Sequence, residues 1–363
     1  MKKRIVSLAL ATAMALSLTA CGGSSKPAET KAAAAPAATE AAAETEAPAK
    51  AGTETIKIVC PYGVGGTADA IARKFALVGN KVNDKYNFIV ENMTGGDGFA
   101  AATWFSEQPV DTKDLLVYGY GVVCRYELGT KYQTEEVDFD RHEFHPIVTV
   151  DDRTWILYTS PDQDLAGILA KAKEGGIKMS GGNALSDPHL ALGTLLSIEG
   201  GKVMVIPYDG GAAQMKALAD GEVDVFVGTT QAGQDAVEAG TLKPILAFGD
   251  TKFEGFVGPD GAIEVPSIAG DAKAPELQAD ADYSPAILRG GGTIATRTGA
   301  DQAWIDEVAE IGKAVWADPE YYEWIESIML NKYEQYDQDA IACVEEVAEK
   351  GVAAFELLSG QGQ

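Results

Sequence analysis

The sequence contains little cysteine and histidine, and this scarcity limits its chemistry. Only four cysteines and three histidines occur in 363 residues. Beyond Cys21 the cysteines are Cys60, Cys124 and Cys343, an odd number without a CxxC pair, which excludes a disulfide framework and a cysteine zinc site. Whether Cys60 and Cys124 pair, or lie as separate buried apolar thiols, is left open by the sequence.

Catalytic constellations are absent as well. The histidines do not have the spacing of metal ligands: they are His142, His145 and His189. No Ser/His/Asp group and no paired carboxylates with supportive spacing occur, and His189 has no acidic or cysteine neighbour at catalytic spacing. We therefore expect neither an enzyme, a cofactor nor a metal site.

Basic residues are few. The chain has 29 Lys and Arg against 54 Asp and Glu, a net charge of −25 at pH 7. Residues 1–20 hold three basic residues and no acid, so their removal would change −25 to −28. Such a charge repels nucleic acid and anionic lipid, which excludes both as partners. It also repels anions at long range, so a carboxylate site would have to be made locally by backbone N–H groups.

The N-terminus has an apolar run too short to span a bilayer comfortably. Residues 5–20 are apolar and follow Lys2, Lys3 and Arg4, a pattern typical of a signal peptide over 1–20. The tetrapeptide at 18–21 is Leu-Thr-Ala-Cys, which resembles the bacterial lipobox. We therefore expect Cys21 to become the lipidated N-terminus. The only membrane contact expected is this lipid anchor, on the outer face of the cell membrane.

Residues 21–53 form the next segment. After Cys21 they are almost wholly Ala, Glu, Thr, Lys, Ser and Gly, with three prolines and no large apolar side chain to bury. We expect a disordered tether. At about 5–6 Å times the square root of its length, its ends would lie roughly 30 Å apart.

Residues 54–363 are long enough for two hydrophobic cores. Short β-branched strands alternate with helical patterns, which favours parallel sheets with ligands beyond the carboxyl ends of the strands. The predicted strands are 56–60, 86–90, 177–179, 203–206 and 223–227. One predicted helix carries Ile71 and Phe75, and two more cover 188–199 and 212–219. Two amphipathic helices follow later in the sequence, one around Trp304 and one around Val344.

Three predicted strand-to-helix turns are rich in glycine: 61–69, 180–189 and 207–211. Glycine lets backbone amides approach a ligand closely. Thr67 suits the N-cap of the first following helix, and Asp69 is favoured in its first turn. In the second turn Asp187 suits the N-cap. Tyr208, in the third, could lay its ring over a ligand. These turns predict a cradle for an anion.

The same turns carry a resemblance to a known family. Residues 58–69 resemble the P-aromatic-x-P-G-G-x-x-D turn of the Bug receptors, the extracytoplasmic binding proteins of tripartite tricarboxylate transporters, although Val64 replaces the family's proline. Residues 91–98 are similar to the family's E-N-x-x-G-x-x-G. The match continues in the family's order over 180–190, 207–212, 221–225 and 239–244. It therefore spans nearly the whole body after the tether.

The resemblance implies a type II periplasmic-binding-protein fold of the α/β class, with two lobes joined by crossing strands and a ligand cleft between them. We expect lobe I at 54–158 and 280–363, and lobe II at 159–279. It also implies a monomer that binds a small carboxylate, through main-chain amides and bridging water, and passes it to permease subunits in the membrane. The ligand-binding residues implied on lobe I are Tyr62, Gly63, Val64, Gly65, Gly66, Thr67 and Asp69. Those implied on lobe II are Ser180, Gly181, Asn183, Ser186, Tyr208 and Asp209.

Two other functions fit parts of the sequence. A receptor that reports to a membrane signalling protein would have a similar binding body. A Rossmann oxidoreductase would use residues 63–68 as G-x-G-x-x-A and Glu91 as its ribose contact. Against the second, the signal peptide directs the chain to a compartment without nicotinamide cofactors, and Pro61-Tyr62 precedes the first glycine.

Overall fold

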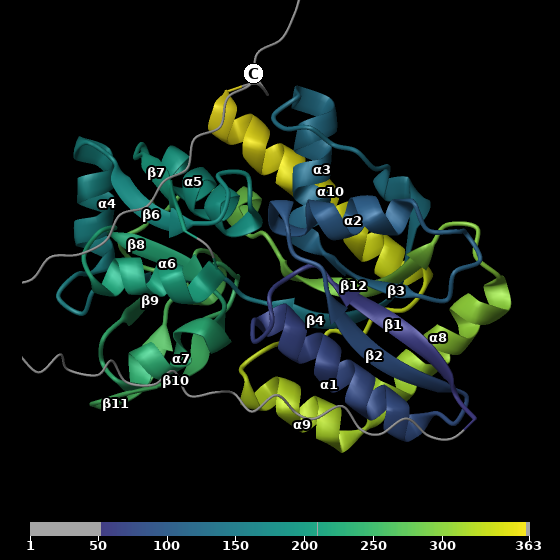
Figure 1. The fold of residues 1–363 in the computed structure, drawn as a ribbon. Coiled ribbons are helices and arrows are strands. Elements are labelled where there is room, and N and C mark those ends of the chain that lie inside the picture. The colour runs from purple at the N-terminus through teal and green to yellow at the C-terminus, as the bar shows by residue number, and fades with distance from the viewer. Residues whose placement is uncertain (1–51, 209, 361–363) are drawn as a thin grey trace, which may run out of the picture. The chain divides into compact units, whose positions relative to one another are not determined.

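Two five-stranded sheets organise the described part of the chain, residues 52–208 and 210–360 of a computed structural model (Figure 1). The first sheet has the order β2-β1-β3-β12-β4 and the second β7-β6-β8-β5-β9. The strands of the first sheet are β1 (Glu54–Cys60), β2 (Tyr86–Asn92), β3 (Leu115–Gly119), β4 (Phe144–Arg153) and β12 (Gly290–Arg297). Those of the second are β5 (Ile156–Thr159), β6 (Ile177–Gly181), β7 (Val203–Pro207), β8 (Val225–Gly228) and β9 (Lys243–Ala247).

The two sheets have the same plan. In each, the second strand in the order pairs in parallel with both of its neighbours: β1 with β2 and β3, and β6 with β7 and β8. The fourth strand of each sheet is antiparallel to both of its neighbours. These antiparallel strands are β12 and β5, each of which enters after the chain has left the other sheet. The chain therefore crosses twice between the sheets.

Helices follow the parallel strands, as the alternating pattern predicts. In chain order they are α1 (Thr67–Val82), α2 (Phe99–Ser106), α3 (Tyr120–Tyr132), α4 (Leu165–Glu174), α5 (Asp187–Glu199), α6 (Gly210–Ala219), α7 (Thr230–Glu238), α8 (Gln302–Ala317), α9 (Pro319–Ser327) and α10 (Gln338–Ser359). Short 3₁₀ turns lie at η1 (Gly96–Gly98), η2 (Arg141–Glu143), η3 (Gly270–Ala272) and η4 (Ser284–Ala286). The α/β class expected from the sequence is confirmed.

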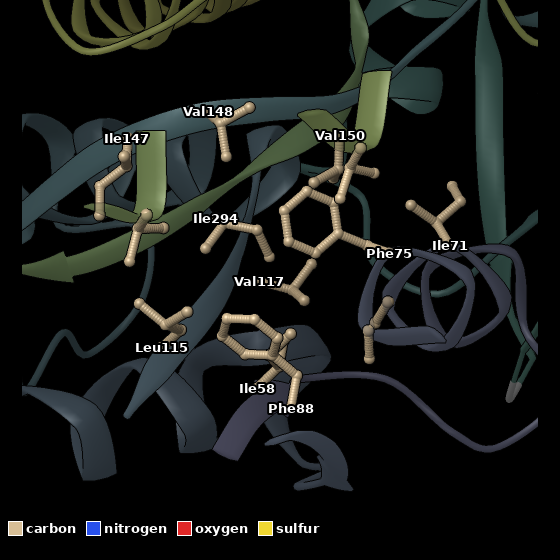
Figure 2. Close-up of a cluster of buried hydrophobic side chains, with 14 of the residues drawn as sticks. Ile58, Ile71, Phe75, Phe88, Leu115, Val117, Ile147, Val148, Val150 and Ile294 are labelled. Atoms are coloured by element: carbon tan, nitrogen blue, oxygen red, sulfur yellow. The ribbon is translucent and has the colours of Figure 1, made fainter. Parts of the chain in front are cut away.

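The main core of the first sheet lies between its strands and helices α1, α8 and α9. Ile294 lies on the sheet beside Phe75 of α1, and Ile58 and Ile71 belong to the same cluster (Figure 2). All four side chains are fully buried. Full burial of such a side chain stabilises the fold by about 1.5–3 kcal/mol. The apolar stripe of α1 therefore fixes this helix on the sheet.

The C-terminal helix α10 packs against elements of both sheets. Figure 1 shows α10 in yellow beside α3 and α5, and both contacts are present. Val344 belongs to an apolar cluster with Val59 and Ala295 of the first sheet. Ala354 belongs to the cluster that holds Leu157 of the second. One helix thus contributes to the packing of both halves.

Several elements differ from the sequence predictions. A hairpin, β10 (Phe253–Gly258) and β11 (Gly261–Val265), was not among the predicted strands; the Pro-Asp-Gly at 259–261 makes its turn. Helix α9 was not expected; Asp318 caps it and Pro319 opens it. β5 straddles the predicted boundary between lobes at 158/159 and pairs within the second sheet.

The alternative of a Rossmann oxidoreductase predicts the strand order 3-2-1-4-5-6. The first sheet instead has β3 beside β1 and an antiparallel strand in fourth place. Glu91, the proposed ribose contact, pairs with Lys57 at 3.0 Å. The fold therefore does not support dinucleotide binding.

Cys60, Cys124 and Cys343, the cysteines in the described residues, are buried free thiols. This settles the open question in favour of separate thiols. Over the same part of the chain, no helix has the combined length and apolar character needed to cross a membrane. The predicted signal peptide (1–20), lipidated Cys21 and nearly all of the tether (21–53) lie outside the described residues.

Candidate functional site

A cavity of about 240 Å³ is lined by residues from both sheets. Val117 and Val150 come from the first sheet, and Met179 and Phe226 from the second. Pockets for drug-sized ligands usually measure about 300–1,000 Å³. The cavity therefore suits a small metabolite.

The N-terminal ends of five helices reach this cavity. Each helix follows a strand: α1 follows β1, α3 follows β3, and α5, α6 and α7 follow β6, β7 and β8. The lining residues at these ends are Thr67, Ala68, Gly119, Gly121, Asp187, Pro188, Gly211, Thr229 and Ala232. A helix N-terminus carries unpaired N–H groups and roughly half a positive charge. Their convergence favours negative charge on a ligand.

Arg153, the last residue of β4, is a cationic side chain in the cavity lining. Its side chain is 14% exposed and hydrogen-bonds through Nε to Asp151, which is 1% exposed. Burial opposes charge on the guanidinium, but the Asp151 carboxylate outweighs burial and raises the pKa of Arg153. Nε is the only side-chain nitrogen of Arg153 that hydrogen-bonds within the described residues, so both terminal nitrogens remain for a ligand. An arginine fork suits a carboxylate.

Two hydrogen bonds fix the backbone of β4 just before Arg153. The indole N–H of Trp316 donates to the carbonyl oxygen of Thr149 at 2.8 Å. The hydroxyl of Tyr321 donates to the carbonyl oxygen of Val150 at 2.7 Å. Both aromatic side chains are buried. Helices α8 and α9 thereby hold the strand end that presents Asp151 and Arg153.

Asp187 places a buried carboxylate in the same cavity. It is the first residue of α5, is 7% exposed and faces α3, where a Cβ at Gly121 would lie 3.1 Å from its Oδ1. Burial, and after it the negative charge of Asp97, raise the pKa of Asp187 to about 7. The charge of Arg153 acts in the opposite direction. The carboxyl therefore changes protonation near neutral pH.

The raised pKa of Asp187 predicts a pH-dependent loss of stability. The folded protein keeps this proton up to about pH 7, whereas the unfolded chain releases it near pH 4, so the free energy of unfolding falls as pH rises between them. Asp187→Asn should remove this loss. We expect the variant to exceed the wild type by roughly 2–4 kcal/mol at pH 8 and to match it at pH 4. Urea denaturation at both pH values measures the difference, and an equal gap at both would contradict the assignment.

The structure brings four of the predicted binding residues to the cavity: Tyr62, Thr67, Gly181 and Ser186. The Tyr62 hydroxyl lies against the backbone at Gly119, where a Cβ would be 2.8 Å from it. Ser186 donates its hydroxyl to the carbonyl oxygen of Asn183 at 2.8 Å. These four lie where they could meet a ligand, and their contact with one stays a prediction.

The other predicted residues of the first turn do not line the cavity. Gly63, Val64, Gly65 and Gly66 are exposed, Val64 by 73%. Asp69 is buried and accepts hydrogen bonds from the Gly65 amide at 2.9 Å and the Asn92 side chain at 2.7 Å. It therefore holds the turn in shape. Because this carboxylate already organises the turn, the predicted N-cap at Thr67 is wrong: Gly66 is the N-cap and makes no side-chain cap.

The second turn begins its helix one residue earlier than predicted. The Asn183 side chain accepts the Leu185 amide at 2.7 Å and forms an Asx turn. Ser186 then becomes the N-cap of α5, and the predicted cap Asp187 is the first helical residue. Asn183 itself does not line the cavity.

Ser180 and Tyr208 do not line the cavity, and their hydroxyl groups have partners within the protein. The Ser180 hydroxyl donates to the carbonyl oxygen of Gln214 at 2.9 Å, and the Tyr208 hydroxyl donates to Glu222 at 2.6 Å. Asp209 lies outside the described residues. Within the described ranges, no group of three His, Cys, Asp or Glu side chains is placed to hold a metal ion.

Sequence reasoning missed Arg153 and Asp97 and gave Asp187 only a capping role. One signal was available for Arg153: the Asp-Asp-Arg at 151–153 directly follows the β-branched run 147–150. Charged residues at the carboxyl end of a buried strand point to a site at the sheet edge. Asp97 and Asp187 gave no comparable signal, because both lie in turns where aspartate is common.

Comparison with known proteins gives a family match over most of the body. Residues 71–350 match the model of the tripartite tricarboxylate transporter family receptor. A UPF0065 protein of Bordetella pertussis is 24% identical over 221 residues, which cover 58% of this chain and 66% of that protein, just under two thirds.

Solved structures share the fold. An R. palustris protein, Rpa4515 with adipate, has a TM-score of 0.71 at 18% identity, over 84% of this chain and 97% of that one. MatC from Rhodopseudomonas palustris with bound malate has a TM-score of 0.65 at 15% identity, over 84% and 98%. The periplasmic binding protein BugD has a TM-score of 0.65 at 18% identity, over 85% and 97%. The predicted periplasmic-binding-protein fold with two lobes is confirmed.

Proposed function

Because this chain belongs to the tripartite tricarboxylate transporter receptor family, we propose that it captures a small carboxylate in the cavity between its sheets. It then delivers that molecule, as a monomer, to the permease subunits of a tripartite transporter. Receptors of this family are extracytoplasmic solute-binding proteins. The observation that carries the proposal is the convergence of Arg153 and five helix N-termini on one cavity.

The chemistry of the cavity supports a carboxylate rather than a neutral ligand. Arg153 offers two terminal nitrogens, and the helix ends offer backbone N–H groups from both sheets. Two relatives in fold hold adipate and malate, both diacids. We extend this ligand class to the present chain: a carboxylate group of a small organic acid binds Arg153.

We propose roles for the predicted binding residues according to their position. Tyr62, Thr67, Gly181 and Ser186 contact the ligand, because they line the cavity. The remaining residues of the three glycine turns set the backbone shape around it. The lobes expected at 54–158 with 280–363 and at 159–279 close over the ligand, since it gains contacts to both only when they meet.

A thermal-shift screen tests this function. The full-length protein in detergent is heated with mono-, di- and tricarboxylates, with neutral sugars as controls. A ligand present at 100 times its Kd adds about 2.7 kcal/mol to the free energy of unfolding, so a true ligand raises the midpoint by several degrees. We expect at least one carboxylate, and no sugar, to do so. A response to sugars alone would contradict the proposed function.

The lipid anchor gives a prediction of its own. We propose that a lipid on Cys21 holds the protein on the outer face of the cell membrane. Cys21→Ala removes the thiol that carries the lipid, and the variant should move almost completely from the membrane pellet to the soluble extracytoplasmic fraction. Fractionation with immunoblotting measures this, with Ser25→Ala as the control from the same segment. Retention of the Cys21 variant in the pellet would contradict lipidation.

A further inference from the structure

The charges of the cavity do not suit a simple diacid. Arg153 is the only Lys, Arg or His in its described lining, whereas Asp97, Asp151 and Asp187 all contribute carboxylates. The Asp151 carboxylate forms an ion pair with Arg153. Two further carboxylates line the cavity: Asp97, which lies 3.7 Å from Arg125, and Asp187. When ionised, Asp187 would repel a second carboxylate of a diacid, and the charge of Asp97 would add to this repulsion.

Asp187 is the more deeply buried of these two carboxylates. It is 7% exposed, and within the described chain its carboxylate accepts a hydrogen bond only from its own backbone N–H. A buried carboxylate that lacks a partner costs several kcal/mol unless it is neutralised. The side chain lies between the start of its own helix α5 and Gly121 of α3, so it faces elements of both sheets. A ligand group there would touch both halves.

Asp97 adds a second negative charge to the same region. It lies in η1 with φ of 52°, and its side chain is 44% exposed. Arg125 holds this turn: its Nη1 donates to the carbonyl oxygen of Gly96 at 2.8 Å and lies 3.7 Å from the Asp97 carboxylate. The charge of Asp97 acts directly on Asp187. Arg125 therefore stabilises the turn in a shape that places the Asp97 carboxylate at the cavity.

We propose that the ligand carries a protonated amine as well as a carboxylate, with the amine bound by Asp187 and the carboxylate by Arg153. This inference rests on the proposed function and narrows its ligand class to amino acids and related amino carboxylates. An ammonium group offers three N–H donors, so it pairs with Asp187 through a charge-assisted hydrogen bond and gains further attraction from Asp97. A metal ion is a poorer occupant, because the described acids do not converge on one point.

Matched ligand pairs test the inference. Calorimetric titration of the full-length protein at pH 8 compares aspartate with succinate, glutamate with glutarate, and 4-aminobutyrate with butyrate. The members of each pair differ only by the amine. We expect at least one amino member to bind 10-fold or more tightly than its partner. If the plain acids bind as well or better in every pair, the inference is overturned while the proposed function stands. If no acid of either kind binds, both fail.

The variant Asp187→Asn provides a second test of the inference. The variant should lose the 10-fold advantage of the amino ligand while it keeps binding of the plain acid, and Asp260→Asn, at the exposed hairpin turn, should change neither. Preserved preference in Asp187→Asn would overturn the inference. Denaturation curves confirm that each variant is folded.

The pH dependence in the wild type distinguishes the two protonation states of Asp187. An ionised carboxylate that holds an amine binds more tightly as pH rises from 6 to 8. A protonated one that donates to a second carboxylate binds more weakly, and that result would overturn the inference. The groups that face Asp187 electrostatically are Tyr62, Asp97, Cys124 and Arg153. Burial raises the pKa of Tyr62 and of Cys124 above this range. In Asp97→Asn the affinity should still rise with pH, but with a lower midpoint, because the charge of Asp97 no longer raises the pKa of Asp187; loss of the rise would point to Asp97 as the titrating group.

Discussion

Replacing Arg153 by glutamine, together with Asp151 by asparagine, is expected to weaken carboxylate binding at least about 100-fold. Loss of one partner of a buried charge pair in a complex typically costs about 2–5 kcal/mol. The double change avoids leaving the Asp151 carboxylate, which is 1% exposed, without its cation. Calorimetric titration with the tightest acid from the thermal-shift screen measures the change.

Two further variants separate the arginine fork from simple charge. Arg153→Lys keeps the charge but offers a point donor, so affinity should fall by about 10-fold and remain measurable. Lys313→Gln removes one positive charge from the exposed face of α8 and should bind normally. Affinity in the double variant within threefold of the wild type would place the carboxylate somewhere other than Arg153.

Gly291→Ala is expected to destabilise the protein by about 2 kcal/mol or more. Gly291 in β12 has φ of +136°, a conformation that alanine rarely adopts. A Cβ there would lie 2.6 Å from the carbonyl oxygen of Asp151 and 3.1 Å from the ring of Tyr120. Both neighbours are buried, so the strand pair β4–β12 must move apart. Urea denaturation gives the free energy of unfolding.

A matched glycine shows whether the effect is specific. Gly249, in contrast, has a free side-chain position, with no atom closer than 3.8 Å, and its φ is not positive. Gly249→Ala should therefore stay within about 0.5–1 kcal/mol of the wild type. An equal loss in both variants, or none in Gly291→Ala, would show that the close contact does not control stability. A drop in carboxylate affinity of folded Gly291→Ala would also follow, since Asp151 supports Arg153.

Local sequence patterns predicted the elements near the chemistry well. The β-branched run at 56–60, the glycine turn and the stripe at Ile71 and Phe75 correspond to β1 and α1. The turn at 180–189 likewise joins β6 to α5. Such patterns predict local structure because the spacing of apolar residues in each element reflects which of its faces is buried. The two-lobed fold was predicted from the family resemblance.

The site itself could be predicted only in part. Arg153 ends β4, a strand whose neighbour β12 comes from the far end of the chain, so nothing local shows that it faces Asp187. The glycines at 63, 65 and 66 looked like ligand contacts because open turns and anion cradles have the same composition. Only the fold shows that Asp69 closes that turn on itself. Pairing across the two sheets is the information that a single sequence lacks.

The position of α10 has a consequence for how the protein unfolds. Its side chains complete apolar clusters of both sheets, through Val344 on one side and Ala354 on the other. Neither half can lose its packing without stripping apolar partners from the same helix. The two halves should therefore melt as one cooperative unit, held together by the packing of α10 against both.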